Sequence, residues 1–238
     1  MQALPSLLTF DAFFFDFDGL LVDTEPLHYL AYQQMLSKRN LVLPWDFATY
    51  CSYAHQKTAV FAEAIFTLFP ALREENPNWM ELREEKVVIY QKLLLTQPVA
   101  LMPGVEKMLH FLARHHKSIY VVTNATRDQL EAIRPQHKAF RAITAWISRE
   151  DYEHPKPAPD SYLKAMELYS KKHFKGIGFE DAIRGIQALK AASLTPVWIL
   201  PSGYARPEAK ELEGVYVFSS FHELLNVSCG YSGSAEYL

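Results

Sequence analysis

The chain has only two cysteines among its 238 residues, Cys51 and Cys229, and they lie far apart in sequence. This spacing fits neither a disulfide framework nor a cysteine metal site, and it favours a reducing compartment. An excess of basic residues is missing too, because 24 lysines and arginines stand against 27 acidic residues, for a formal net charge of −3. No basic field therefore points to a nucleic acid or to an anionic membrane as a partner.

Long hydrophobic runs are also lacking, since no apolar stretch approaches the length needed to span a bilayer. The first residues lack the positively charged segment of a secretory signal, and Asp11, Asp16 and Asp18 interrupt their apolar character. We therefore expect no membrane partner and a cytoplasmic location. With 49% hydrophobic and 21% charged residues, the composition is that of a globular protein.

Apolar runs alternate with helical patterns over most of the chain. Its length is enough for one large domain, or for one domain with an insertion. Strands that alternate with helices predict an α/β fold with a parallel sheet and right-handed crossovers. The predicted strands cover 10–22, 118–123, 142–147, 176–179, 196–200 and 215–218. The helices predicted between and after them cover 103–115, 126–138, 159–169, 182–193 and 207–212.

A helical block interrupts this alternation after the first strand. Apolar residues at helical spacing predict a helix over 26–40, and residues 41–98 contain helical patterns without a continuous apolar strand run. The last thirteen residues are mostly small and polar. We therefore divide the chain into a core of 1–25 and 99–226, a helical insertion of 26–98 and a flexible tail of 227–238.

The segment from Phe13 to Thr24 reads FFFDFDGLLVDT and carries the clearest chemical signal. Carboxylates are costly to bury unless they are paired or bound to a metal, so a buried strand that ends at Asp16 and Asp18 suggests an active site. Residues two apart on a strand point to the same side, and Gly19 lets the backbone turn away. The alternative is a simple turn in which the aspartates cap backbone N–H groups.

Polar residues also follow two other predicted strands. A hydroxyl, an amide and loop N–H groups at Thr123-Asn124 are suited to holding a phosphate, although one of these residues is also suited to capping the next helix. Glu180-Asp181 ends an apolar strand with two acids, and paired carboxylates suit Mg²⁺. A capping aspartate is the alternative there. In open parallel sheets ligands bind at these carboxyl ends, near the point where the strand order reverses.

Lys156 lies in the proline-rich segment His154-Pro-Lys-Pro-Ala-Pro159. Each residue before a proline is restricted to extended geometry, so the lysine projects from a stiff loop. A lysine is a strong point charge for a phosphate. Taken alone, however, a lysine in a turn is more often a solvated surface residue.

The four motifs together resemble those of the haloacid dehalogenase superfamily, in the branch that contains β-phosphoglucomutase and phosphoglycolate phosphatase. The resemblance rests on Asp16-Phe-Asp18-Gly with Asp23-Thr24, on Thr123-Asn124, on Lys156-Pro-Ala-Pro, and on Phe179-Glu180-Asp181 with Gly185-Ile186. It extends over nearly the whole chain, from about Phe13 to Leu225. It implies a Rossmann-like core with a helical cap of the C1 type inserted after the first motif.

The resemblance also implies roles for the acids and a Mg²⁺ cofactor. Asp16 would attack phosphorus as the nucleophile, and Asp18 would protonate the leaving oxygen and later deprotonate the attacking water. Mg²⁺ would be bound by a carboxylate oxygen of Asp16, by the carbonyl of Asp18, and by Asp181 with help from Glu180.

Thr123 and Lys156 would complete the catalytic residues, and the other candidates would bind the substrate. Thr123, Lys156 and the N–H near Asn124 would hold the phosphoryl oxygens. We also assign Thr24 and His55 to substrate binding. The partner expected is a small phosphorylated metabolite, and the chain is expected to be a monomer or a weak dimer.

The resemblance predicts a Mg²⁺-dependent phosphatase that forms an aspartyl-phosphate, with a sugar phosphate, phosphoglycolate or a nucleotide as the type of substrate. Asp18 argues against dehalogenation, because true haloacid dehalogenases lack this second acid. One alternative is a phosphosugar mutase, although the segment Tyr50–Lys57 lacks the glycine and arginine with which phosphoglucomutases hold the distal phosphate. A second alternative is a binding module without catalytic activity, against which the intact acids argue.

Overall fold

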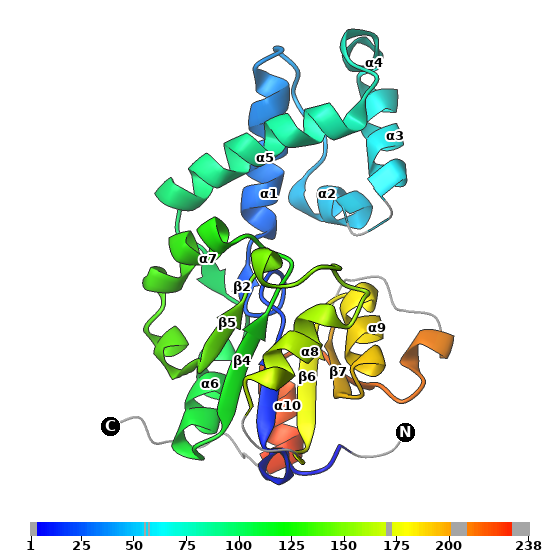
Figure 1. Cartoon of the computed structure of the whole chain (residues 1–238). Helices are drawn as coiled ribbons and strands as arrows, with labels where there is room; N and C mark the ends of the chain where they lie inside the picture. The colour runs from blue at the N-terminus through cyan, green and yellow to red at the C-terminus, as the bar shows by residue number, and fades with distance from the viewer. Residues whose placement is uncertain (1–3, 55, 57, 170–172, 201–208, 230–238) are drawn as a thin grey trace. The chain divides into compact units, whose positions relative to one another are not determined.

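In the computed structural model the chain forms two compact units (Figure 1). One unit contains Met1–Asp23 and Ala100–Leu238, and the other contains Thr24–Val99. The structure describes residues 4–54, 56, 58–169, 173–200 and 209–229. The first unit is called the core here, and the second the helical unit.

The core is built on a six-stranded parallel sheet with the order β5-β4-β1-β6-β7-β8. In β1, Phe15 lies opposite Val121 on one side and Phe179 on the other. Numbered along the chain, these strands have the order 3-2-1-4-5-6, which is that of doubly wound nucleotide-binding folds. The strands are β1 (Ala12–Phe15), β4 (Ser118–Val122), β5 (Ala145–Ile147), β6 (Gly176–Glu180), β7 (Thr195–Ile199) and β8 (Tyr216–Phe218).

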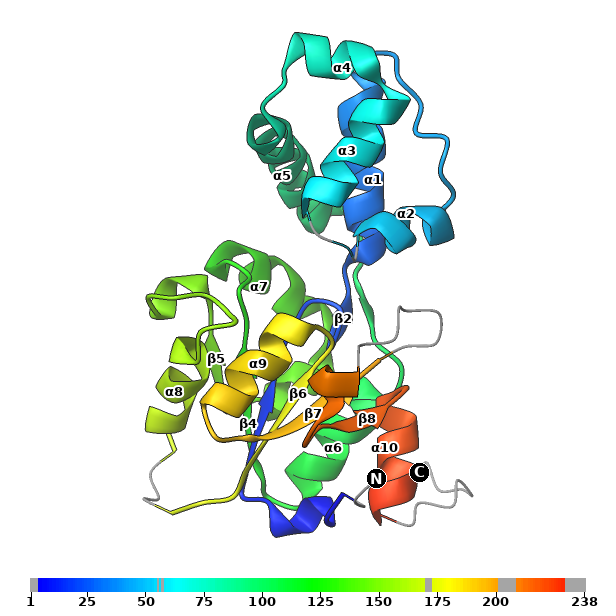
Figure 2. The same ribbon diagram turned by 90° about the vertical axis from the view of Figure 1, so that its right-hand side faces the viewer.

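Helices cover both faces of this sheet, with α8 and α9 on one face and α6 and α10 on the other (Figures 1 and 2). The bounds are α6 (Val105–Arg114), α7 (Arg127–Ile133), α8 (Asp160–Glu167), α9 (Ile183–Ala191) and α10 (Phe221–Cys229). Short 3₁₀ helices lie at Leu7–Thr9, Arg134–Gln136, Lys138–Ala142, Arg149–Asp151 and Ala209–Leu212.

Strand β1 is buried on both faces, as its run of apolar residues predicts for a central parallel strand. Its alternate side chains serve opposite layers. Phe14 stacks on Tyr120 at 5.2 Å and packs with Tyr162 and Leu189, in the layer of α8 and α9. Phe15 stacks on Phe179 at 4.7 Å and lies 5.8 Å from Phe221 of α10, in the opposite layer.

The strand predicted over 10–22 is shorter in the structure. After β1 the carbonyl of Phe17 accepts hydrogen bonds from the N–H groups of Leu20, Leu21 and Val22, which turns the chain back on itself. Gly19 has a φ of +76° in this turn, a value that favours glycine. The chain then forms β2 (Val22–Asp23), which pairs antiparallel with β3 (Ala100–Leu101).

The tail predicted over 227–238 also needs a correction at its start. Residues 227–229 belong to helix α10, which the sequence analysis did not predict. Phe221, Leu224 and Leu225 of this helix are buried against the core, and burial of this apolar face stabilises the helix.

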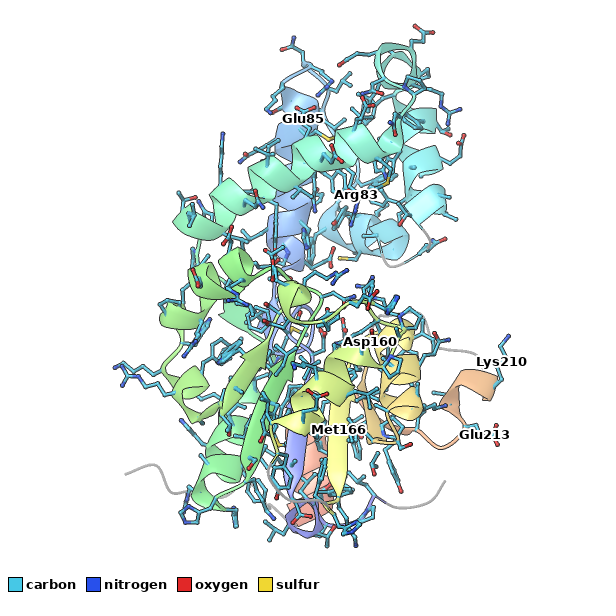
Figure 3. The ribbon with its side chains drawn as sticks, in the orientation of Figure 1. Arg83, Glu85, Asp160, Met166, Lys210 and Glu213 are labelled. Carbon is cyan, nitrogen blue, oxygen red and sulfur yellow. The ribbon has the colours of Figure 1, made fainter. Side chains whose placement is uncertain are left out.

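The helical unit contains α1 (Glu25–Ser37), α2 (Phe47–Ala54), α3 (Thr58–Leu68), α4 (Pro70–Glu75) and α5 (Trp79–Thr96). Aromatic rings fill its interior: Phe61 lies 4.8 Å from Tyr32 and 5.7 Å from Trp79. On the surface, Glu85 of α5, which Figure 3 labels, pairs with Arg39 at 2.9 Å. None of the helices in the described part of the chain is long and apolar enough to cross a lipid bilayer.

Candidate active site

Three predicted site residues lie at the carboxyl ends of adjacent strands. Asp16 directly follows β1, and its N–H still bonds to the carbonyl of Phe179 at 3.0 Å. Thr123 follows β4, and its N–H bonds to the carbonyl of Ile147 at 3.0 Å. Glu180 is the last residue of β6. Because β4, β1 and β6 are neighbours in the sheet, these residues meet at one edge, at the point where the strand order reverses.

Lys156 reaches this edge from the proline-rich loop and is buried, with 5% of its surface exposed. Its Nζ lies 2.5 Å from Asp16 Oδ1, 2.6 Å from Glu180 Oε1 and 2.7 Å from the carbonyl oxygen of Val122. An ammonium has three protons to donate, and three acceptors surround it. Burial alone would lower the pKa of Lys156, but Asp16 and Glu180 raise it above its ordinary value. The alternative of a solvated surface lysine is therefore wrong.

Glu180 is held on several sides. Its Oε1 accepts a hydrogen bond from the Tyr162 hydroxyl as well as from Lys156, and the residue is 1% exposed. A Cβ at Gly185 would lie 1.9–2.2 Å from the Glu180 carboxyl atoms, so only glycine leaves room for this side chain. Burial raises the pKa of Glu180 to about 7, and the adjacent Lys156 opposes this shift.

Asp16, Glu180 and Asp181 form an acidic cluster in which one carboxylate oxygen of each lies within 4.8 Å of the others. Burial, and then the negative charges of Asp16 and Glu180, raise the pKa of Asp181 well above its ordinary value. Gly19 adds to the close packing, because a Cβ there would lie 2.3 Å from Asp181 Oδ2. A divalent cation with oxygen ligands would relieve this repulsion, so the donor set fits Mg²⁺.

Asp18 lies in the turn after β1, where a bridge pairs it with Val22. Its Oδ1 accepts a hydrogen bond of 2.7 Å from Nε2 of Gln129, on the first turn of α7. Asp16 and Asp18 are thus held by different partners. Gln129 was not among the site residues predicted from the sequence, although the pattern Thr126-x-x-Gln129 is a recognisable signal of a helix start.

Thr123 and Asn124 form the loop between β4 and α7. Thr123 Oγ1 accepts a hydrogen bond of 3.0 Å from the N–H of Ala125, which lies before α7. The N-cap residue of α7 is Thr126, so the alternative in which Thr123 or Asn124 caps this helix is wrong. The Tyr152 hydroxyl lies 2.7 Å from Asn124 Oδ1 and 2.8 Å from the carbonyl oxygen of Thr123. The backbone N–H of Lys156 also points to Asn124 Oδ1, at 3.3 Å. These contacts join the loop to the segment that carries Lys156.

The same segment is fixed at its other end. Asp160, in the first turn of α8 and labelled in Figure 3, accepts a hydrogen bond from the backbone N–H of His154 at 3.1 Å, and its Oδ2 lies 2.8 Å from His154 Nδ1. The Asp160 carboxylate raises the pKa of His154. Lys156 is therefore anchored between Asn124 and the start of α8.

Two predicted substrate-binding residues are not among those that the strand ends bring together. Thr24 is the N-cap residue of α1 and belongs to the helical unit, so its contact with a substrate stays a prediction. His55 lies outside the described residues.

Known proteins resemble this chain over most of its length. A family model for haloacid dehalogenase-like hydrolases matches residues 10–193. The chain is 28% identical to the fructose-1-phosphate phosphatase YqaB of Escherichia coli, over 77% of this chain and 93% of that protein. It is 27% identical to the β-phosphoglucomutase of Mycobacterium bovis, over 77% of this chain and 78% of that protein.

A solved structure supports the fold. The crystal structure of CbbY from Rhodobacter sphaeroides in complex with phosphate matches 90% of this chain and 96% of that one, with a TM-score of 0.65 and 22% identity. Together with the six-stranded parallel sheet and the helical unit, this likeness confirms the predicted α/β class with a helical cap.

Proposed function

Because this chain belongs to the haloacid dehalogenase-like hydrolases, we propose that it is a Mg²⁺-dependent phosphatase of small phosphorylated metabolites. The observation that carries this proposal is the buried ion pair of Asp16 and Lys156, set beside Glu180 and Asp181 at the switch point of the sheet. A carboxylate that is fixed at the end of a strand beside a cation is suited to attack a phosphate dianion, because the cation offsets the repulsion between the two anions.

The reaction runs in two steps on the side chains of this chain. In the first, an oxygen of Asp16 forms a bond to phosphorus while the bond from phosphorus to the leaving alcohol breaks, and Asp18 gives its proton to that alcohol oxygen. In the second, water attacks the phosphorus of the aspartyl-phosphate, Asp18 takes the proton of the water, and inorganic phosphate leaves Asp16 free.

The other residues hold the reacting groups. Lys156 keeps one oxygen of Asp16 in place and supplies positive charge next to the phosphoryl group. The hydroxyl and N–H groups of Thr123 and Asn124 would bind phosphoryl oxygens. Asp16 and Asp181, with the carbonyl of Asp18, would hold Mg²⁺. Glu180 would act mainly by holding Lys156, because its Oε1 accepts hydrogen bonds from both Lys156 and Tyr162. When bound, Mg²⁺ supplies charge neutralisation at the phosphoryl oxygens.

The relatives favour a phosphorylated sugar as the substrate. YqaB is named as a fructose-1-phosphate phosphatase, and a further relative from Thermotoga maritima is named as a phosphatase of phosphorylated carbohydrates. Phosphoglycolate and nucleotides are the other substrate types to be tested, because they carry the same phosphate that the assigned residues of the core would bind.

A phosphosugar mutase is the second candidate, and the likeness to a β-phosphoglucomutase supports it. A mutase must hold a second phosphate, for which arginine offers a bidentate fork. The segment Tyr50–Lys57 contains no arginine, so the phosphatase reaction is favoured.

The test measures release of inorganic phosphate from a panel of sugar phosphates, phosphoglycolate and nucleotides, with and without Mg²⁺. We expect release that requires Mg²⁺ and that is lost in Asp16→Asn. Asp128→Asn makes the same change at an exposed residue of α7 and keeps the activity. Conversion of glucose 1-phosphate to glucose 6-phosphate without release would favour the mutase. Substantial release by Asp16→Asn would contradict the assigned nucleophile.

A further inference from the structure

Gln129, the third residue of helix α7, makes an unusual side-chain contact. Thr126 is the N-cap residue and its hydroxyl accepts a hydrogen bond from the N–H of Gln129. Thr-x-x-Gln is the pattern of a capping box, in which the glutamine side chain turns back to the N-cap. Here Nε2 of Gln129 reaches Asp18 Oδ1, at 2.7 Å.

This bond joins two elements that are 111 residues apart in sequence. Asp18 lies in a turn, whereas Gln129 is fixed on a helix whose neighbouring residue Leu130 is buried in the core. A side chain on a packed helix gives a more rigid point of attachment than a turn does. The carboxyl group of Asp18 is therefore oriented by α7 and not only by its own backbone.

The direction of the bond has a chemical consequence. A glutamine N–H donates, so it bonds to a carboxyl oxygen that carries no proton. With Oδ1 of Asp18 engaged in this way, a proton on the carboxyl group must sit on Oδ2. The bond thus selects the oxygen that carries the proton and limits rotation of the group.

We propose that Gln129 is a positioning residue that presents Oδ2 of Asp18 to the leaving oxygen of the substrate. This inference rests on the proposed function, because it needs Asp18 to act as the proton donor. Proton donation by a positioned side chain contributes about a hundredfold to ten-thousandfold to a rate, and small errors in orientation lose a large part of it.

The test compares two leaving groups. An alkoxide needs a proton to leave a phosphate, whereas p-nitrophenolate leaves without one. The ratio kcat/KM reports on steps up to the first irreversible one, which include departure of the alcohol. We expect Gln129→Met to lower kcat/KM for the best alkyl phosphate of the panel by about tenfold to hundredfold, and that for p-nitrophenyl phosphate by less than about threefold.

Matched variants separate positioning from folding. Methionine keeps the length and the helix propensity of glutamine but removes its donor. Gln136→Met makes the same change in the 3₁₀ helix that follows α7, where Nε2 bonds to the carbonyl of Ala132 at 3.1 Å, and leaves kcat/KM for both substrates unchanged. Gln129→Glu sets a second carboxylate against Asp18 and lowers kcat/KM for the alkyl phosphate at least as far as Gln129→Met.

Equal losses with both leaving groups, in a variant that melts like the wild type, would overturn the proposal, because Gln129 would then act on the phosphoryl site or the fold. Unchanged kcat/KM with both would overturn it as well. Failure of the proposed function is a distinct result: the wild type would then release no phosphate from any substrate of the panel.

Discussion

The Nζ atom of Lys156 lies 2.5 Å from Oδ1 of Asp16, although 140 residues separate the two in sequence. The ammonium is shared with Glu180 and the carbonyl of Val122, so it links the ends of β1, β4 and β6. A cation in this position offsets the repulsion between two neighbouring buried carboxylates and holds one of them in place as a nucleophile. Substitution of the residues in this buried group should therefore change both the stability and the activity of the protein.

Removing the charge of Lys156 should weaken both stability and activity. Lys156→Met leaves Asp16 and Glu180 without their buried partner, and loss of one member of such a group costs about 3–5 kcal/mol in the free energy of unfolding. Activity should fall at least about a hundredfold, because the charge next to the phosphoryl group is lost. Urea unfolding without Mg²⁺ and phosphate release measure the two effects.

The control for this variant is Lys164→Met. Lys164 pairs with Glu167 at 3.0 Å on the exposed side of α8, and a pair of that kind contributes less than about 1 kcal/mol. If Lys156→Met unfolds at the same urea concentration as Lys164→Met, the buried group does not stabilise the core in the way described.

Gly185→Ala should be harmful, although alanine is the better helix former by about 1 kcal/mol. The added methyl group meets the carboxyl of Glu180 at 1.9–2.2 Å, so Glu180 must move and loosen its bonds to Lys156 and Tyr162. We expect a lower melting temperature and a lower kcat. In a Glu180→Ala background the same change should cost less, since the clashing group is gone. Independent, additive effects of the two substitutions would contradict this steric coupling.

The affinity for Mg²⁺ should depend more on Asp181 than on Glu180. Glu180 Oε1 is engaged by Lys156 and Tyr162. Burial, and then repulsion by Asp16 and Glu180, raise the pKa of Asp181, and a bound cation would relieve that repulsion. Asp181→Asn is therefore expected to weaken Mg²⁺ binding by at least about tenfold, and Glu180→Gln to weaken it less. Calorimetric titration with Mg²⁺ alone gives both affinities. The reverse order would make Glu180 the principal ligand.

The helical unit should lose stability in mild acid because of His28. This residue stacks on Tyr90, and its Nδ1 lies 2.6 Å from Nζ of Lys86. Burial, and then the charge of Lys86, lower the pKa of His28 from 6.5 to about 3. Between these values the unfolded chain binds more protons than the folded one, so the free energy of unfolding falls as the pH is lowered, by about 2 kcal/mol at pH 5 from this group.

Chemical unfolding at pH 7 and pH 5 tests this expectation. His28→Asn keeps an acceptor near Lys86 without a titrating ring, so it should lose less stability between the two pH values than the wild type does. His110→Asn, at an exposed residue of α6, should leave the pH dependence unchanged. Identical pH dependence in His28→Asn and in the wild type would contradict the assignment.

The sequence was a good guide wherever chemistry and periodicity were local. The buried run before Asp16 predicted the central strand, and the alternation of strands and helices predicted the parallel sheet. It was a poor guide where a turn replaced a strand after Phe17, and where helix α10 extends into residues 227–229 of the predicted tail. In the first place, local hydrogen bonds to the Phe17 carbonyl form the turn. In the second, burial of Phe221, Leu224 and Leu225 stabilises the helix, as packing does for most helices.

By itself, therefore, the sequence determined the residue types of the site, their order along the chain and the class of fold that carries them. Tertiary structure alone decided their partners. From the sequence, Lys156 resembles a surface residue and Gln129 a residue of a helix cap. In the fold, Lys156 contacts Asp16, and Gln129 contacts Asp18. The physical reason is that hydrogen bonds and ion pairs act over a few ångströms, and only the order of the strands sets which distant residues come that close.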